Sequence, residues 1–273
     1  MNAPPTDRIR FCADDYALAP GVGRAIRRLL AERRIDVTSV MVLFPEFDSE
    51  IAALKALGGD FAVGLHLTLT DHAPLGAMAR LAPDGRLPSL SRLLALAFTG
   101  GLDAAEIAAE VGRQFDRLAA GLGRPPDFID GHQHVQALPV VRQAVLAVSR
   151  RTGARLRLVG PPPGASPWRL PAPVKAATLA ALGSPLAREA GERAMNTGLL
   201  GLRRFVEAAP YRALFRRWLA AATPGTMIMC HPGEPDDALA SRDPVVGPRA
   251  EELAYLAGPA FAEDVAAAGK RIA

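Results

Sequence analysis

The side chains best suited to chemistry in this chain are carboxylates and imidazoles that follow short apolar segments. They are the adjacent pair Asp14 and Asp15, then His66, His132 and His231. Two imidazoles and one carboxylate form a ligand set that leaves a coordination position open, which is typical of a catalytic zinc site. A bound metal polarises a carbonyl oxygen and acidifies water, and a second carboxylate can accept the proton. The pattern predicts a metal-dependent hydrolase.

Each of these residues also has an explanation that involves no metal. An Asp-Asp pair after a strand is often a helix N-cap or a loop acid. His66, flanked by leucines, is typical of a hydrogen-bonded core histidine. His132 and His134 stand in a glycine-containing turn where this spacing also arises by chance, and His231 before Pro-Gly can simply shape a loop. Because all of them fall where separate strands are expected to end, we favour a shared metal site.

Strand-like and helix-like segments alternate along most of the chain. Apolar runs predict strands at residues 8–13, 37–44, 61–69, 128–129, 155–159 and 227–230. Helical periodicity predicts helices at residues 21–34, 48–57, 103–122, 139–151 and 211–222, and two short helices around residues 251 and 263. Such alternation favours a parallel sheet or a (β/α) barrel. In a barrel, the carboxyl ends of the strands are where active sites are assembled.

The alternation is interrupted between about residues 160 and 210. This stretch opens with PPPGASPWRLPAP and continues with helical pieces, and no strand is evident in it. We expect it to be an insertion or lid beside the site. It would belong to a single domain that covers residues 1–273.

The composition is that of a globular protein with a mildly basic surface. The 273 residues include 32 Lys and Arg against 28 Asp and Glu, and 49% are hydrophobic, enough for one large core. The arginine pairs lie in amphipathic stretches, so they indicate solvated helix faces more than a nucleic-acid interface. Two cysteines, Cys12 and Cys230, make no disulfide framework. The first residues lack the apolar stretch of a signal peptide, and a cytoplasmic location is expected.

Four segments, in order, resemble the motifs of the YdjC-like carbohydrate deacetylases, a family that includes chitooligosaccharide and hopanoid-glycan deacetylases. These segments are CADDYALAPGVGRAI, VGLHLTLTDHAPL, FIDGHQHVQALPVV and MIMCHPGEPD. Near the C-terminus, RAEEL is similar to a recurrent Arg-x-x-Glu-Leu element of the family. The resemblance extends from about residue 8 to 270 and is weakest between about 161 and 210.

The resemblance implies an α/β fold, a deformed (β/α) barrel that is TIM-barrel-like and similar to the NodB-type deacetylases. It implies removal of the acetyl group from an N-acetylated amino sugar, with a divalent metal, Zn or Mg, as cofactor. By this resemblance Asp15, His66 and His132 would bind the metal, Asp14 would be the general base, and His231 would protonate the leaving amine. The substrate would be a free oligosaccharide or a lipid-linked glycan, and a homodimer is one candidate assembly.

The chain departs from the family pattern at a few positions near the expected site. Tyr16 and Ala17 stand where Phe-Gly is usual, Cys12 replaces a small polar residue, and Gln136 replaces a further histidine of the third motif. None of these changes removes an expected ligand, so they bear on the substrate more than on the chemistry. Trp168 or Phe205 of the 160–210 segment could stack on a sugar ring, and its arginines could contact a phosphate. The same residues could simply pack the lid.

Two other classes of function are compatible with the same residues. A phosphoesterase or cyclic amidase often binds two metals ~3.5–4 Å apart, and the spare ligands nearby are Asp130, His72 and His134. Asp130 could instead orient a ligand imidazole through a hydrogen bond. A non-catalytic sugar-binding protein on the same fold is the other alternative. Metal stoichiometry and acetate release would separate these hypotheses.

Overall fold

Eight parallel strands form one curled sheet in the computed structural model, which describes residues 8–205 and 209–272. The strand order is β5-β4-β3-β2-β1-β7-β6, and β8 pairs with β1. The strands are β1 (Arg8–Tyr16), β2 (Val37–Val40), β3 (Ala62–Leu67), β4 (Phe128–Gly131), β5 (Arg155–Leu156), β6 (Gly198–Leu200), β7 (Thr226–Cys230) and β8 (Arg271–Ile272). Most are buried on both faces, as parallel strands between helices are. The predicted deformed (β/α) barrel is confirmed.

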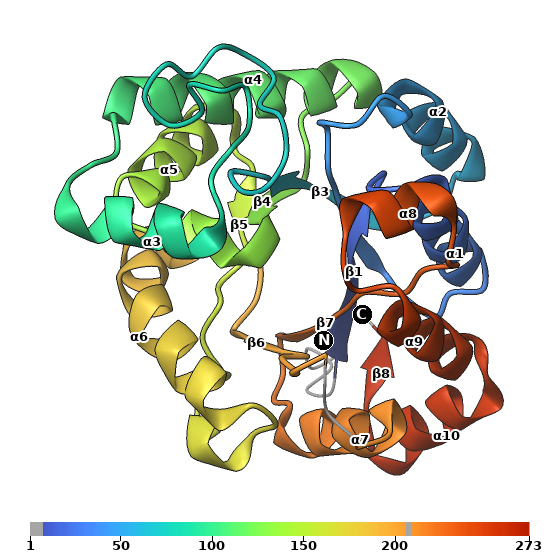
Figure 1. Ribbon diagram of the computed structural model, residues 1–273. Helices are drawn as coiled ribbons and strands as arrows, with labels where there is room; N and C mark the ends of the chain where they lie inside the picture. The colour runs from blue at the N-terminus through green and yellow to red at the C-terminus, as the bar shows by residue number, and fades with distance from the viewer. Residues whose placement is uncertain (1–7, 206–208, 273) are drawn as a thin grey trace.

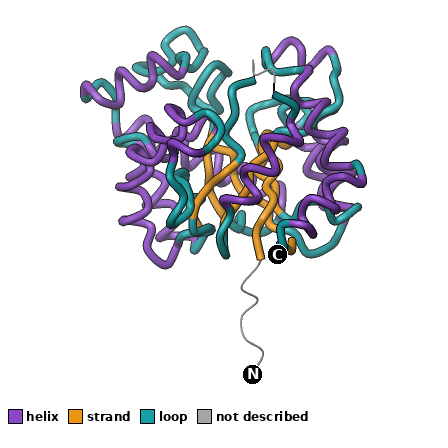
Figure 2. The backbone as a smooth tube through the Cα atoms, turned by 90° about the horizontal axis from the view of Figure 1, so that it is seen from below, coloured by secondary structure: helices purple, strands orange, loops and turns teal. Residues whose placement is uncertain are grey.

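Helices surround this sheet on its outer side (Figures 1 and 2). They are α1 (Pro20–Ala31), α2 (Phe47–Leu57), α3 (Leu90–Thr99), α4 (Ala104–Leu122), α5 (Val141–Thr152), α6 (Pro173–Ala190), α7 (Tyr211–Ala221), α8 (Asp237–Arg242), α9 (Gly247–Ala257) and α10 (Pro259–Ala267). The apolar spacing explains their packing. In α4, for example, Ile107, Val111, Phe115 and Leu118 recur every three or four residues and are all buried.

Most of these elements follow the sequence pattern, but α3, α8, β6 and β8 were not predicted. The three-residue strand β6 lies inside the 160–210 segment, where we expected no strand. The backbone around residues 194–199 pairs with the barrel wall, so this part of the segment belongs to the sheet.

The helices of the structure bear on whether the chain crosses a membrane. Within residues 8–205 and 209–272, no helix is both long enough and apolar enough to cross a bilayer. Residues 1–7, on which the expected lack of a signal peptide depends, lie outside the described part of the chain.

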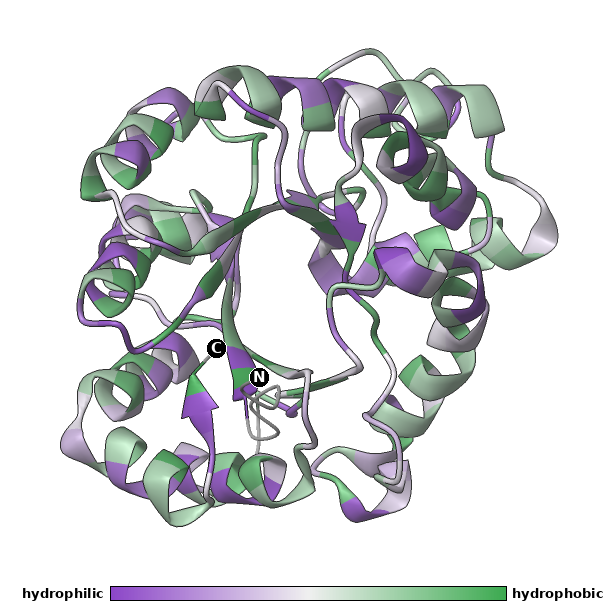
Figure 3. Cartoon of the chain, turned by 180° about the vertical axis from the view of Figure 1, so that it is seen from behind, coloured by the Kyte–Doolittle hydropathy of each residue, from purple (hydrophilic) through white to green (hydrophobic). Residues whose placement is uncertain are grey.

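The side chain of Asn196 ties the two edges of the sheet together. Its Oδ1 accepts a hydrogen bond from the Leu158 N–H at 2.8 Å, and its Nδ2 donates to the carbonyls of Leu158 and Gly198 at 3.2 and 2.8 Å. Close by, the Met195 N–H donates to the carbonyl of Leu156. Because β5 and β6 would otherwise present open edges, these bonds close the wall. The strands thus curve around the centre of the molecule inside the helices (Figure 3).

We expect Asn196→Ala to lower the free energy of unfolding by about 2–4 kcal/mol, because it leaves buried backbone groups without partners. Urea denaturation measures this change. Thr197→Ala is the matched control, since the Thr197 hydroxyl donates one exposed hydrogen bond to the Pro224 carbonyl. Equal losses for the two variants would contradict the role given to Asn196.

Candidate active site

A break in strand regularity lets both aspartates of β1 face the same cavity. Successive side chains of a regular strand point to opposite faces. Asp15 has a left-handed backbone, with φ of 68°, and the pairing of β1 with β2 shifts between Ala13 and Tyr16. Aspartate tolerates this conformation better than most residues. Asp14 and Asp15 therefore both line the cavity at the carboxyl end of the sheet.

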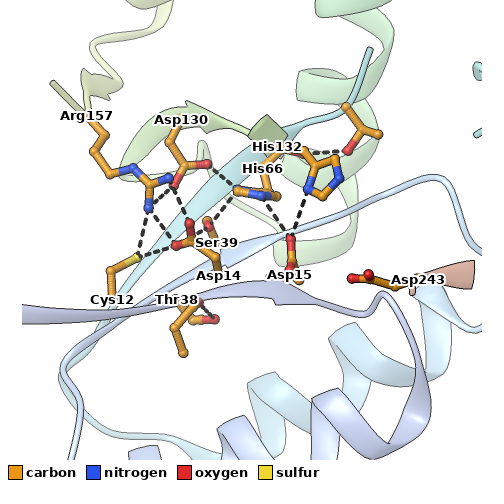
Figure 4. Close-up of polar contacts among 12 residues, drawn as sticks. Cys12, Asp14, Asp15, Thr38, Ser39, His66, Asp130, His132, Arg157 and Asp243 are labelled. Atoms are coloured by element: carbon orange, nitrogen blue, oxygen red, sulfur yellow. Dashed lines mark hydrogen bonds and ion pairs between the residues drawn. The ribbon is translucent and has the colours of Figure 1, made fainter. Parts of the chain in front are cut away.

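Asp15, His66 and His132 meet in one compact cluster (Figure 4). Asp15 Oδ1 lies 3.0 Å from His66 Nε2 and 3.3 Å from His132 Nδ1. One donor atom from each residue lies within 4.8 Å of the others. The three come from the ends of β1, β3 and β4, which are far apart in sequence. A carboxylate and two imidazoles around one point are a suitable donor set for a divalent metal with an open position.

The far side of His66 is fixed by a carboxylate. His66 Nδ1 lies 2.7 Å from Asp130 Oδ1 and 3.0 Å from Ser39 Oγ. Burial would lower the pKa of His66, but Asp130 and Asp15 outweigh it and raise that pKa to about 10. The surroundings thus favour positive charge at this position, which a divalent cation would supply. A carboxylate behind a ligand imidazole is also the usual arrangement in metal sites.

Asp14 is held by a buried arginine that follows β5. Arg157 Nη1 and Nη2 contact the two oxygens of Asp14 at 2.6 and 2.8 Å, and Nη1 lies 2.9 Å from Asp130 Oδ2. Burial would raise the pKa of Asp14, but Arg157 outweighs it and leaves that pKa well below its usual range. Asp14 is therefore an ionised carboxylate held in a fixed position beside the cluster.

His231 follows β7 directly and lines the same cavity. Its backbone N–H donates to Glu252 Oε2 at 2.6 Å, and its ring packs edge-on against Phe205 at 5.6 Å. Burial lowers the pKa of His231 to about 4, although Asp15 and Asp14 oppose that shift. The imidazole is therefore neutral near pH 7, and it can serve as an acid only after it has accepted a proton.

The spare candidates Asp130 and His134 lie outside the cluster of three. Asp130 is occupied by His66 and Arg157, as described above. His134 is buried at the cavity wall, and its Nδ1 has no hydrogen-bond partner among the described residues. Cys12, Asp14 and Asp130 form a second group of close donor atoms. A second cation there would compete with the Arg157 guanidinium, which speaks against a two-metal centre.

A cavity of about 700 Å³ is lined by the cluster and its neighbours Asp14, His134 and His231. The 160–210 segment forms part of its wall through Lys175, Leu179, Leu182, Arg203 and Phe205. Leu90 and Leu94 of α3 add apolar surface. Of the two aromatic side chains that we expected as candidate contacts, Trp168 is 67% exposed and does not line this cavity. Phe205 is the aromatic side chain of the segment that does.

The sequence of the whole barrel has a match among known protein families. The family model described as YdjC-like protein matches residues 8–267. The chain belongs to the YdjC-like family. Curated relatives include chitooligosaccharide deacetylases of Yersinia pestis (strain Pestoides F) and Yersinia pseudotuberculosis (serotype O:1b). Each is 38% identical over 148 residues, which are 54% of this chain and 57% of the relative. The match therefore spans a little over half of those relatives.

Among solved structures, one from Enterococcus faecalis V583, named provisionally as a cellobiose-phosphate cleavage protein, covers nearly all of this YdjC-like chain. The two superpose with a TM-score of 0.76 at 20% identity, over 98% of this chain and 97% of the other. At that identity the likeness concerns the fold alone.

The positions where this YdjC-like chain departs from the motifs lie mostly behind the site. The Tyr16 hydroxyl donates to the Glu50 carbonyl at 2.7 Å, away from the cavity. The Cys12 thiol lies 3.3 Å from Asp14 Oδ1, and Gln136 donates to the Arg157 carbonyl at 3.4 Å. Cys12 thus contacts Asp14, and Gln136 contacts Arg157, which holds Asp14. The cavity wall itself is formed by other residues.

Sequence reasoning missed three charged residues that hold the site of this YdjC-like protein. Arg157 belongs to the predicted strand at residues 155–159, where an arginine between two leucines was the available signal. Arg249 and Glu252 belong to the RAEEL element, to which the sequence assigned no role. Arg249 Nη2 contacts Asp15 Oδ2 at 2.6 Å.

Proposed function

We propose that this chain is a metal-dependent hydrolase that removes the acetyl group from an N-acetylated amino sugar. The observation that carries the proposal is a fixed carboxylate, Asp14, beside the compact cluster of Asp15, His66 and His132, all of which line one large cavity. Membership of the YdjC-like family and relatives named chitooligosaccharide deacetylases support the substrate class.

Asp15, His66 and His132 are the residues that would hold the metal, Zn or Mg. When bound, such an ion polarises the acetamide carbonyl and makes water more acidic. Asp130 would keep the His66 ring in place through Nδ1 and leave Nε2 directed at the cluster. The carboxylates of Asp15, Asp14 and Asp130 around His66 place negative charge here, which supports a cation at this position.

Asp14 is proposed as the general base. It would accept a proton from the attacking water while the water oxygen forms a bond to the acetamide carbon. The Arg157 fork supports this role in two ways, since it keeps the carboxylate ionised and fixes both of its oxygens. A positioned base of this kind contributes about 10²–10⁴-fold to a rate.

His231 is proposed as the group that delivers a proton to the leaving nitrogen. Because His231 is neutral at rest, the proton that Asp14 takes from water must pass to His231 before His231 delivers it to the leaving nitrogen. The C–N bond then breaks, the amino sugar leaves with that proton, and the acetyl group leaves as acetate. One water molecule is consumed for each acetate and each amine formed.

A panel of N-acetylated sugars tests this proposal through acetate release. The panel should hold free chito-oligosaccharides and the same sugars carried on a lipid, assayed with chelator and with added Zn or Mg. We expect release from at least one member, loss of activity with chelator, and recovery with metal. Acetate release that is unchanged by the chelator would contradict metal dependence. Two tightly bound ions per chain would favour a two-metal hydrolase.

A further inference from the structure

Two buried charges one turn apart on α9 reach towards the reaction centre. They are Arg249 and Glu252, which are 2% and 1% exposed. Residues three apart lie on the same face of a helix, and here that face is directed at the carboxyl ends of β1 and β7. Buried charges are costly unless they are paired, so their partners are informative.

Arg249 forms an ion pair with Asp15 on the side away from the two histidines. Its Nη2 contacts Asp15 Oδ2 at 2.6 Å, and its Nε donates to the Val245 carbonyl at 3.0 Å. Asp243 provides a second carboxylate for the same Nη2. Because Oδ2 of Asp15 is taken by the guanidinium, Oδ1 is the oxygen left facing His66 and His132.

Glu252 accepts a hydrogen bond from the backbone of His231. Its Oε2 accepts from the His231 N–H at 2.6 Å, and the Gly233 N–H donates to the Arg249 carbonyl at 3.2 Å. The loop that carries His231 is therefore bonded to α9 at two places. Burial raises the pKa of Glu252 to about 7. The carbonyl oxygen of a neutral carboxyl also accepts from an N–H, so the contact does not require the charge.

We propose that Arg249 and Glu252 act together as positioning residues, the α9 pair. Arg249 selects the oxygen of Asp15 that faces the cluster, and Glu252 holds His231 at the cavity wall. The two halves serve different steps, since Arg249 acts on metal affinity and Glu252 on proton delivery. Both halves rest on the proposed function, the first through its metal site and the second through its proton transfer.

The test compares metal affinity, by competition with a chelator, with kcat and KM at saturating metal. Arg249→Met should weaken metal binding about 10–100-fold, as removal of a ligand's partner does. Glu252→Ala should leave metal affinity unchanged and lower kcat by about 10–100-fold with little change in KM, because a misplaced group is costly. Glu252→Gln should restore most of kcat, since its amide oxygen can accept from His231.

Glu251→Ala is the matched control on the same helix, because Glu251 contacts Arg203 and the Tyr211 N–H. It should leave metal affinity unchanged. An Arg249→Met protein with wild-type metal affinity would overturn the first half. The imidazole NMR signals of His231 test the second half without turnover, and we expect them to shift in Glu252→Ala and return in Glu252→Gln. Unshifted signals in Glu252→Ala would overturn it, whether or not the wild type releases acetate.

Discussion

Replacing Asp14 with asparagine is expected to lower kcat by about 10³-fold while metal binding is retained. The asparagine side chain has nearly the same shape but accepts no proton from water at neutral pH. Its oxygen can still accept a hydrogen bond from Arg157, so the cavity should keep its form. Metal affinity should change little, because Asp14 stands outside the cluster of Asp15, His66 and His132.

Steady-state kinetics at saturating metal measure this effect, and a metal titration measures retention. Asp71→Asn is the matched control, since Asp71 lines the same cavity but is not in the cluster of Asp15, His66 and His132. It should retain kcat within a few-fold. If Asp14→Asn keeps the activity of the wild type, the assignment of Asp14 as the base is wrong.

Replacing His132 with alanine is expected to weaken metal binding at least ~100-fold, more than loss of a partner behind a ligand does. His132 supplies one of three donor atoms, and the two that remain cannot hold a divalent ion firmly. Turnover should fall with metal occupancy, and excess metal should restore only part of it. Titration of the metal-free protein, followed by calorimetry, gives the affinity directly.

His72→Ala is the control for that substitution. The His72 ring lies 6.4 Å from the His132 ring, centre to centre, and lines the same cavity, but His72 is not in the cluster. The control should bind metal like the wild type. Equal losses for the two variants would mean that the ligand set differs from Asp15, His66 and His132.

The parts of this site that sequence patterns predict are those at strand ends. An apolar run that stops at a carboxylate or an imidazole is visible without a structure, which is why Asp14, Asp15, His66 and His132 could be grouped. The parallel sheet then brings them to one edge. The helices with strong periodicity, such as α4, could be placed for the same reason.

The parts that patterns do not predict depend on contacts between distant segments. Arg157 could be assigned to Asp14 only from the three-dimensional arrangement, because 143 residues separate them. Strand β6 has three residues, too few for a periodic signal, and its position depends on Asn196. The left-handed backbone at Asp15, which turns both aspartates into the cavity, also cannot be predicted from the composition of the segment.

The most direct test of the central claim is the joint measurement of acetate and free amine on the best sugar of the panel, with metal-loaded, chelated and reloaded protein. We predict equal amounts of acetate and amine from the loaded protein, neither after chelation, and both again after metal is returned. Consumption of the sugar without acetate, by cleavage at a glycosidic or phosphate bond, would contradict the proposed function.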